Sequence, residues 1–368
     1  MGILQPASAR PPLSSRQRVL TAFALQEPDR VPIQYMDNAG LRARMKAHFE
    51  LAPDDDEGLL TRLETDFRGI WPSYRGPRLH AEIPDRQVDA VWGYRRMWIE
   101  HQSGGYWDYC DYPLAGSPAE TFDRWPMPSP DDFDYSGVQA ACRKHPDRAL
   151  HLGDPGTGDI MNSAGMLMGV EQAMMEIVDP DSPLQRLVDR RIAAQLGVLE
   201  RALEAGRGRI DFLWIGEDLG TQRGPLISMD TYRRFIKPRH KKFVDLAKAW
   251  NIPVMIHCCG SSSWAFDEFI ELGISAVDTL QPEAANMAPA LLKARWGRKL
   301  AFHGCISTAG PVACGTVQQV RENLRQTLET MMPGGGYCMA PTHCLQDNSP
   351  TENVVAMYEA AREFGRYR

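Results

Sequence analysis

The stretch 254–262 reads VMIHCCGSS, and it carries both a structural and a chemical signal. Its first residues form a short apolar run, which is typical of a buried strand. The run ends in His257, Cys258 and Cys259, and a glycine and three serines follow directly. An imidazole and two thiols at the end of a buried strand indicate that this strand end faces a functional site as well as a core.

The same pattern of an apolar strand followed by a helix recurs along the second half of the chain. Strands are predicted at 211–218, 252–260, 274–282, 299–307 and 334–344, and helices at 229–250, 261–273, 288–296, 316–330 and 350–364. Five successive units of this kind require a parallel sheet covered by helices. Polar residues recur at several strand ends, and neither GxGxxG nor GxxxxGK[ST] occurs in the chain. We therefore predict an α/β fold, namely a (β/α)8 TIM barrel, in preference to an open doubly wound sheet.

The whole chain, residues 1–368, is expected to form one barrel domain. An N-terminal helical extension of about 1–28 contains an amphipathic helix at 14–26, and 30–36 is predicted as the first strand. Residues of about 85–145 are rich in Trp, Tyr, Pro and Asp, which predicts a long connection or a small β excursion. The aromatic side chains of this excursion either pack in the interior or line the mouth of a pocket.

Composition narrows the classes of partner. The 41 basic and 47 acidic residues give a formal net charge of −6 without any basic block, which argues against nucleic acid and anionic membrane partners. No apolar run approaches the roughly 20 residues of a membrane helix, and the N-terminus lacks the apolar core of a secretory signal. The eight cysteines do not form a disulfide framework. We expect a cytoplasmic protein with a small-molecule substrate, and a homodimer stays open.

Strand alternation places His257 and Cys259 on one side of the backbone and Cys258 on the other. An H-x-C pair at a strand end suits zinc, which would take further N, S or O ligands from neighbouring strand ends. The alternative interpretation is ordinary packing, because cysteines and hydrogen-bonded histidines are common in protein cores. The recurrence of such residues at several strand ends favours a metal site, and the further ligand candidates are Glu217, Asp218, His303, Cys305, His343 and Cys344.

Five longer stretches carry a family pattern: RQRVLTAFALQEPDRVPIQ (16–34), FLWIGEDLGTQRGPLISMDTYRRFIKPRHKK (212–242), MIHCCGSS (255–262), LAFHGCIS (300–307) and PGGGYCMAPTHCLQDNSPTENVVAMYEAAREFG (333–365). Through them the chain resembles the uroporphyrinogen decarboxylase superfamily, in particular its branch of decarboxylase-like proteins and cobalamin-linked zinc methyltransferases. The resemblance runs nearly from end to end. It implies a uroporphyrinogen decarboxylase-like (β/α)8 barrel with its active site at the carboxyl ends of the strands.

The methyltransferase members of that superfamily bind zinc through an H-x-C pair and a later cysteine, which implies His257 and Cys259 as ligands here. Counted back from SPTEN (349–353), the third position falls on His343, and Cys344 follows one residue later. The resemblance therefore implies a methyltransferase that uses Zn²⁺ and moves a methyl group between a small-molecule donor or thiol acceptor and a corrinoid (cobalamin) protein, for example in O-demethylation.

Two alternatives stay open. Decarboxylases of the superfamily hold their substrate with an arginine-rich segment and an aspartate, whereas the matching segment here has Arg42 and Arg44 without an RQAGRY-like run. A metal-free decarboxylase of a small carboxylate would protonate a developing carbanion from an acid such as His343. The third interpretation is a non-catalytic barrel that binds a small molecule.

Specific roles follow for the polar residues near the predicted strand ends. Glu217 is expected to be an extra zinc ligand, Asp218 to orient His257, and His343 to act in catalysis beside Cys344 as a metal ligand. The residues expected to contact the substrate are Tyr35, Asp66, Arg68, Gln222, Gln281 and His303, with Trp71 as part of an aromatic wall.

Overall fold

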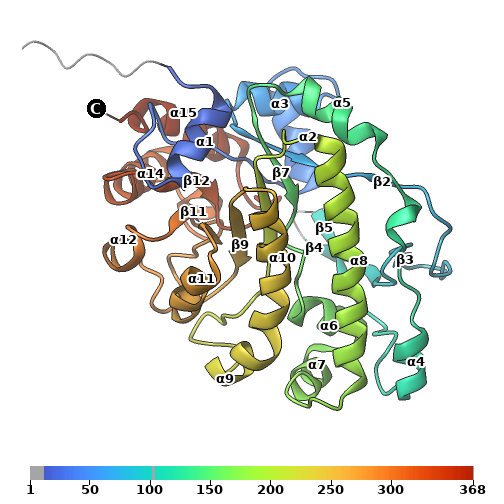
Figure 1. Cartoon of the computed structure of the whole chain (residues 1–368). Helices are drawn as coiled ribbons and strands as arrows, with labels where there is room; N and C mark the ends of the chain where they lie inside the picture. Colours follow the sequence, from blue (N-terminus) through green and yellow to red (C-terminus); the bar gives the residue numbers. More distant parts are fainter. Residues whose placement is uncertain (1–11, 102–103, 368) are drawn as a thin grey trace, which may run out of the picture. The chain divides into compact units, whose positions relative to one another are not determined.

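The computed structural model describes residues 12–101 and 104–367 (Figure 1). Seven strands form one sheet in the order β1-β7-β8-β9-β10-β11-β12. Neighbouring strands pair in the parallel sense, as in β8 with β9 and β11 with β12. This arrangement, with helices between successive strands, confirms the predicted (β/α)8 class. The strands are β1 (Phe67–Ile70), β7 (Ala149–Gly153), β8 (Phe212–Gly216), β9 (Val254–Cys258), β10 (Ala276–Thr279), β11 (Ala301–Ile306) and β12 (Tyr337–Pro341).

The chain divides into two compact units. Unit 1 comprises Met1–Arg68, Asp147–Ala149 and Ser275–Arg368, and unit 2 comprises Gly69–Pro146 and Leu150–Ile274. The expectation of a single domain stays a prediction.

In unit 1, residues 30–37 take the place of an eighth strand. Ile33 bridges Met339 of β12 in the parallel sense, and the Gln34 N–H donates to Met339 O at 3.0 Å. On its other side, Ile33 O accepts the N–H of Asp66 at 2.8 Å, one residue before β1. The predicted first strand therefore lies between β12 and β1.

The helices of unit 1 begin where the sequence offers caps. Ser14 and Gln17 form a capping box at the start of α1, and Thr316 and Gln319 form another at the start of α14. Of the predicted N-terminal extension, residues 1–11 lie outside the described residues. The helices of this unit are α1 (Ser15–Phe23), α2 (Ala39–His48), α3 (Asp56–Arg62), α12 (Pro289–Trp296), α13 (Pro311–Cys314), α14 (Val317–Met331) and α15 (Thr351–Phe364).

In unit 2, the helix predicted at 229–250 is interrupted. A π-helical turn (Tyr232–Ile236) separates α9 (Met229–Thr231) from α10 (Lys237–Ala249). Pro238 has no N–H, so the carbonyl four residues earlier lacks its α-helical partner and the turn widens. The other α-helices of the unit are α4 (Ala119–Arg124), α5 (Ser136–Lys144), α6 (Met161–Met168), α7 (Val170–Glu176), α8 (Pro183–Gly206) and α11 (Phe266–Leu272).

The long helix α8 packs beside α10, and α6 and α7 lie together near the first residues of α8 (Figure 1). Across the described ranges, no helix combines the length and the apolar composition that a bilayer crossing requires.

The aromatic-rich segment of unit 2 forms small antiparallel sheets. Strands β3 (Gln87–Val88), β4 (Arg95–His101) and β5 (Gly104–Tyr109) pair in that order, and β2 (Ser73–Tyr74) pairs with β6 (Phe133–Asp134). The Trp98 and Trp107 rings lie edge to face, with centroids 5.6 Å apart. Strands β3 to β6 lie within the range of about 85–145, and the bounds of the predicted excursion stay a prediction.

Candidate metal centre

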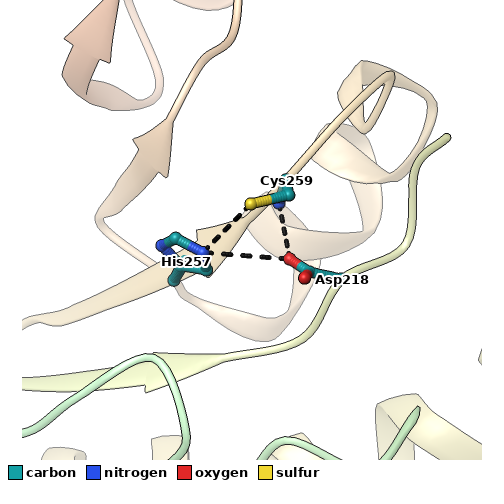
Figure 2. A group of neighbouring side chains, drawn as sticks. All are labelled: Asp218, His257 and Cys259. Atoms are coloured by element: carbon teal, nitrogen blue, oxygen red, sulfur yellow. Dashed lines mark hydrogen bonds and ion pairs between the residues drawn. The ribbon is translucent and has the colours of Figure 1, made fainter. Parts of the chain in front are cut away.

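Asp218, His257 and Cys259 converge on one small region of unit 2 (Figure 2). Each offers one ligand atom, and these atoms all lie within 4.8 Å of one another. Cys259 Sγ lies 3.3 Å from His257 Nε2, and His257 Nε2 lies 3.8 Å from Asp218 Oδ1. One sulfur, one imidazole nitrogen and one carboxylate oxygen form a ligand set that zinc accepts.

The end of β9 separates the two neighbouring cysteines. Cys258 is fully buried, and its Sγ accepts the N–H of Leu219 at 3.4 Å, whereas Cys259 is partly exposed beside His257. Burial raises the pKa of the Cys259 thiol, and the hydrogen bond with His257 opposes this shift. Cys259 is therefore a thiol at neutral pH, and a bound cation would convert it to the thiolate.

Two glycines let the loops after β8 and β9 approach each other. A Cβ atom at Gly260 would lie 2.3 Å from Gly220 O, and one at Gly220 would lie 2.4 Å from Ser261 N. Gly260 also has a φ of +68°, in the left-handed region that side chains disfavour. The Ser261 N–H donates to Thr221 O at 2.8 Å, which joins the two loops. This close approach places Asp218 beside the β9 residues.

Asp218 is held by both of its carboxylate oxygens. Oδ1 accepts the backbone N–H of Cys259 at 2.7 Å, and Oδ2 accepts Nδ2 of Asn162 at 2.9 Å. Asn162 lies in the first turn of α6, on a different crossover from β8 and β9. The carboxylate therefore has a fixed orientation toward the ligand cluster.

Glu217 points in the opposite direction from its neighbour. It is buried, and its two oxygens accept the backbone N–H groups of Ile160 and Met161 at 3.0 and 2.9 Å. These are N–H groups that the start of a helix leaves without partners. Glu217 thus anchors α6, and Asp218 lies at the cluster. The roles expected for them, Glu217 as an extra zinc ligand and Asp218 as the residue that orients His257, stay predictions.

A second carboxyl completes the start of α6. Asp159 accepts the N–H of Asn162 at 3.3 Å and that of Ser163 at 2.8 Å. Burial, followed by the neighbouring Glu217, raises the pKa of Asp159 well above its usual range. Neither Asp159 nor Asn162 is among the sequence-predicted site residues. The available signal was the spacing of an aspartate just before an apolar helix start, which is typical of an N-terminal cap.

The surroundings of Glu217 keep it neutral. Burial raises the pKa of Glu217 to about 8 and lowers that of His240 to about 4. His240 Nε2 lies 3.5 Å from Glu217 Oε2, and both side chains are fully buried. An ion pair would shift both pKa values the other way, so desolvation is the larger effect and both groups are uncharged at pH 7.

Asp66 and Arg68, which the sequence suggested as substrate contacts, have structural partners in unit 1. Asp66 is fully buried and accepts Nη1 of Arg18 at 2.6 Å and Nη1 of Arg30 at 2.7 Å. Arg68 is buried and donates to Glu57 Oε1 at 2.7 Å through Nη2. A buried charge requires such compensation. The substrate contacts expected of Asp66 and Arg68 stay predictions.

Tyr35 and His303 are also used within unit 1. Tyr35 is buried, and its hydroxyl donates to Asp37 Oδ2 at 2.8 Å. His303 is buried on β11, and its Nδ1 lies 2.6 Å from Oδ1 of Asp278 on β10. Both side chains thus have an internal polar partner, and their expected contact with the substrate stays a prediction.

The remaining predicted residues lie in loops or at the surface. Gln222 is exposed in the loop after β8, and Trp71 is 44% exposed. In unit 1, Gln281 follows β10 and is half-buried, His343 is exposed with Nδ1 3.2 Å from Cys344 O, and Cys344 is half-buried. The role of His343 or Cys344 as a third ligand stays a prediction.

The fold and the cluster define a parallel α/β barrel with metal-competent side chains at the carboxyl ends of β8 and β9. The family model of uroporphyrinogen decarboxylase (URO-D) matches residues 160–364, which is more than half of the chain and includes all three cluster residues. The chain belongs to this family.

One solved structure supports the same fold. A methyltransferase from Methanosarcina mazei matches 96% of this chain and 99% of its own length, with a TM-score of 0.61 and 19% sequence identity. The 3-keto-L-gulonate-6-phosphate decarboxylase from Vibrio cholerae O1 biovar El Tor str. N16961 matches 62% of this chain and 79% of its own at 13% identity, with a TM-score of only 0.29. A comparison with curated proteins finds no match.

Proposed function

We propose that this protein is a zinc-dependent methyltransferase that moves a methyl group between a small molecule and a corrinoid protein. The observation that carries the proposal is the convergence of Asp218, His257 and Cys259. Membership of the URO-D family and the shared fold with a methyltransferase support it.

The donor set fits a zinc ion. With Zn–N and Zn–O bonds of about 2.0–2.2 Å and a Zn–S bond of about 2.3 Å, two ligand atoms of a tetrahedral site lie about 3.3–3.8 Å apart. The pair formed by Cys259 Sγ and His257 Nε2 is separated by 3.3 Å, and His257 Nε2 lies 3.8 Å from Asp218 Oδ1. Three protein ligands with one position left for substrate is the usual composition of a catalytic zinc site.

A bound zinc ion would supply a Lewis acid that lowers the pKa of a coordinated thiol or hydroxyl group. The chain contributes the surroundings of that ion. Asp218 and deprotonated Cys259 would balance its charge, and Asn162 would keep the Asp218 carboxylate in place. The partial exposure of His257 and Cys259 supports access from solvent. A thiol acceptor or a methyl ether donor, as in O-demethylation, is the substrate class that this chemistry serves.

His343 or Cys344 is proposed as a ligand that holds the fourth position of the same ion until substrate replaces it, so that three protein ligands remain during reaction. Gln222 is proposed to orient a polar substrate. The two alternatives are a metal-free decarboxylase and a non-catalytic binding barrel. Neither requires zinc, so a protein that binds no zinc would favour one of them.

The experiment measures zinc content and methyl transfer in the purified protein. We expect about one zinc per chain after loading. With an added thiol as acceptor, methylcob(III)alamin should give the methyl thioether, cob(I)alamin and a proton, and the visible spectrum of the corrinoid follows this transfer. His257→Ala and Cys259→Ser are expected to lose both. Cys258→Ala is the matched control, because this neighbouring thiol faces the protein interior, and it should retain zinc. Zinc binding that survives Cys259→Ser, or a chain that binds no zinc, would contradict the proposal.

A further inference from the structure

Helix α7 and the turn after it expose apolar side chains to solvent in unit 2. Val170 (61% exposed) and Met175 (62%) lie on α7, Val178 (48%) lies in the turn that follows, and Tyr112 is 40% exposed beside Gly169, where a Cβ atom would lie 3.8 Å from the Tyr112 ring. At about 100° per residue, Val170 and Met175 lie about 140° apart around α7, with the exposed Glu171 between them. We call these four residues the α7 patch. Exposed apolar groups that gather in one place are typical of interaction surfaces.

The rim of the α7 patch is acidic. The segment 171–181 reads EQAMMEIVDPD and contains four acidic residues and no lysine or arginine. Glu176 accepts side-chain hydrogen bonds from Gln172 and Ser182. Within the part of the chain that the structure describes, none of the four carboxylates forms an ion pair. The segment therefore keeps an uncompensated negative charge around an apolar centre.

The acidic rim of the α7 patch favours one kind of binding partner over another. A second copy of the chain that docked patch to patch would bring two acidic rims together, and like charges placed opposite each other disfavour association. A different protein with an apolar centre and a basic rim would instead gain electrostatic attraction. The methionine in the patch has a flexible, polarizable side chain that adapts to partner surfaces.

The α7 patch is linked to the candidate metal centre through α6. Asn162, in the first turn of α6, donates to Asp218, and α7 begins directly after Gly169 at the other end of that helix. The eight residues of α6 span about 12 Å at 1.5 Å per residue. The start of α6 is fixed by the carboxyl groups of Glu217 and Asp159. A protein bound on α7 would therefore lie next to the strand ends that carry the cluster.

We propose that the α7 patch is the docking surface for the protein that carries the corrinoid, and that this partner presents an apolar surface with a basic rim. The inference rests on the proposed methyltransferase function and adds to it the location and the chemistry of the partner surface.

The experiment compares two methyl donors at several salt concentrations: free methylcob(III)alamin and a purified corrinoid carrier protein in its methylated form. For Val170→Glu/Met175→Glu, we expect the KM for the carrier protein to rise at least about tenfold while the KM for free methylcob(III)alamin changes less than about twofold. Glu171→Lys/Asp179→Lys should raise the KM for the carrier protein and weaken its dependence on salt. Val317→Glu on α14, at 39% exposure, is the matched control and should change neither KM.

Two results would contradict the docking proposal and leave the proposed function intact. One is an unchanged KM for the carrier protein in Val170→Glu/Met175→Glu. The other is a wild-type dimer in analytical ultracentrifugation that this variant converts to a monomer. In both cases free methylcob(III)alamin still reacts. The absence of zinc binding and of transfer from either donor would instead contradict the proposed function. Zinc content and melting temperature of each variant establish that it is folded.

Discussion

Asp218 Oδ1 lies 3.8 Å from His257 Nε2 and at the same time accepts the backbone N–H of Cys259. One carboxylate oxygen is therefore directed at the ligand cluster and fixed by the neighbouring loop. The preceding residue, Glu217, directs its carboxyl group to the start of α6. The two consecutive acidic residues therefore have different partners, one at the ligand cluster and one at the start of α6.

Asp218→Asn is expected to lower zinc affinity by more than about 100-fold, because it removes a ligand, whereas Asn162→Ala, which loosens only its orientation, should cost about tenfold. Competition with a chromophoric chelator measures both. Glu217→Gln should leave zinc affinity nearly unchanged. If Glu217→Gln lost zinc and Asp218→Asn retained it, Glu217 would be the ligand that the sequence first suggested.

The close approach of the loops after β8 and β9 gives the second prediction. Gly260→Ala would place a Cβ 2.3 Å from Gly220 O at a φ of +68°, so the loop must move away and carry Cys259 with it. We expect loss of zinc binding in a protein that still folds, as judged by circular dichroism. Gly224→Ala, in the same loop as Gly220, meets no atom within 4 Å and should bind zinc normally. Equal zinc affinity in the two variants would show that the close approach does not position the ligands.

Burial of Glu217 gives the third prediction, for zinc-free protein. Its folded pKa of about 8 lies above the ordinary value of 4.5, so its contribution to stability is complete below pH 4.5 and is lost as the pH rises to about 8. The pKa of His240 shifts the other way, from 6.5 to about 4. Its contribution is present in both wild type and Glu217→Gln and therefore cancels from their difference. Between pH 6.5 and 8 the wild type should lose up to about 2 kcal/mol of unfolding free energy relative to Glu217→Gln, at 1.36 kcal/mol per pH unit.

Glu268 is the matched control with the opposite sign. It is buried between Arg233 and Lys237, whose hydrogen bonds lower its pKa. Its contribution is present above the unfolded pKa and is lost in acid, so Glu268→Gln should show no change relative to wild type between pH 6.5 and 8. Urea unfolding at the two pH values measures both variants. If the difference in unfolding free energy between wild type and Glu217→Gln did not change with pH, Glu217 would be ionised in the folded protein.

The sequence predicted those parts of the fold that local patterns specify. Each strand after residue 210 is a short apolar run, and the helix after β9 ends at Gly273, which adopts the left-handed conformation of a helix C-terminus. Helices α6 and α7 were not predicted from the sequence. The α6 sequence MNSAGMLM is apolar on nearly all sides, so it lacks the period of an amphipathic helix, and its start is fixed by Glu217, more than 50 residues away.

The candidate site also combines features that the sequence predicts with features that depend on distant contacts. The pairing of His257 with Cys259 follows from the period of one strand, which is a local property. The choice between Glu217 and Asp218 depends on which of them meets the N–H groups of α6, and that contact is not local. Asp66 illustrates the same limit, because its partners Arg18 and Arg30 lie 48 and 36 residues away in the sequence.

The buried position of Asp66 gives the last prediction. Its carboxylate accepts Arg18, Arg30 and the N–H of Ile33 at 2.8 Å, the residue that bridges β12. Asp66→Asn leaves the half-buried Arg30 without this carboxylate and leaves the buried Arg18 with Asp29 as its charge partner. The cost in unfolding free energy should therefore stay below the about 3–5 kcal/mol of a buried charge that loses its partner. The zinc content of the folded protein should stay unchanged. Asp245→Asn is the control, because the Asp245 side chain (49% exposed) pairs with the exposed Lys241 (60%) and such surface pairs contribute at most about 1 kcal/mol. If Asp66→Asn kept its stability but raised the KM for the small-molecule substrate, Asp66 would be the substrate contact that the sequence suggested.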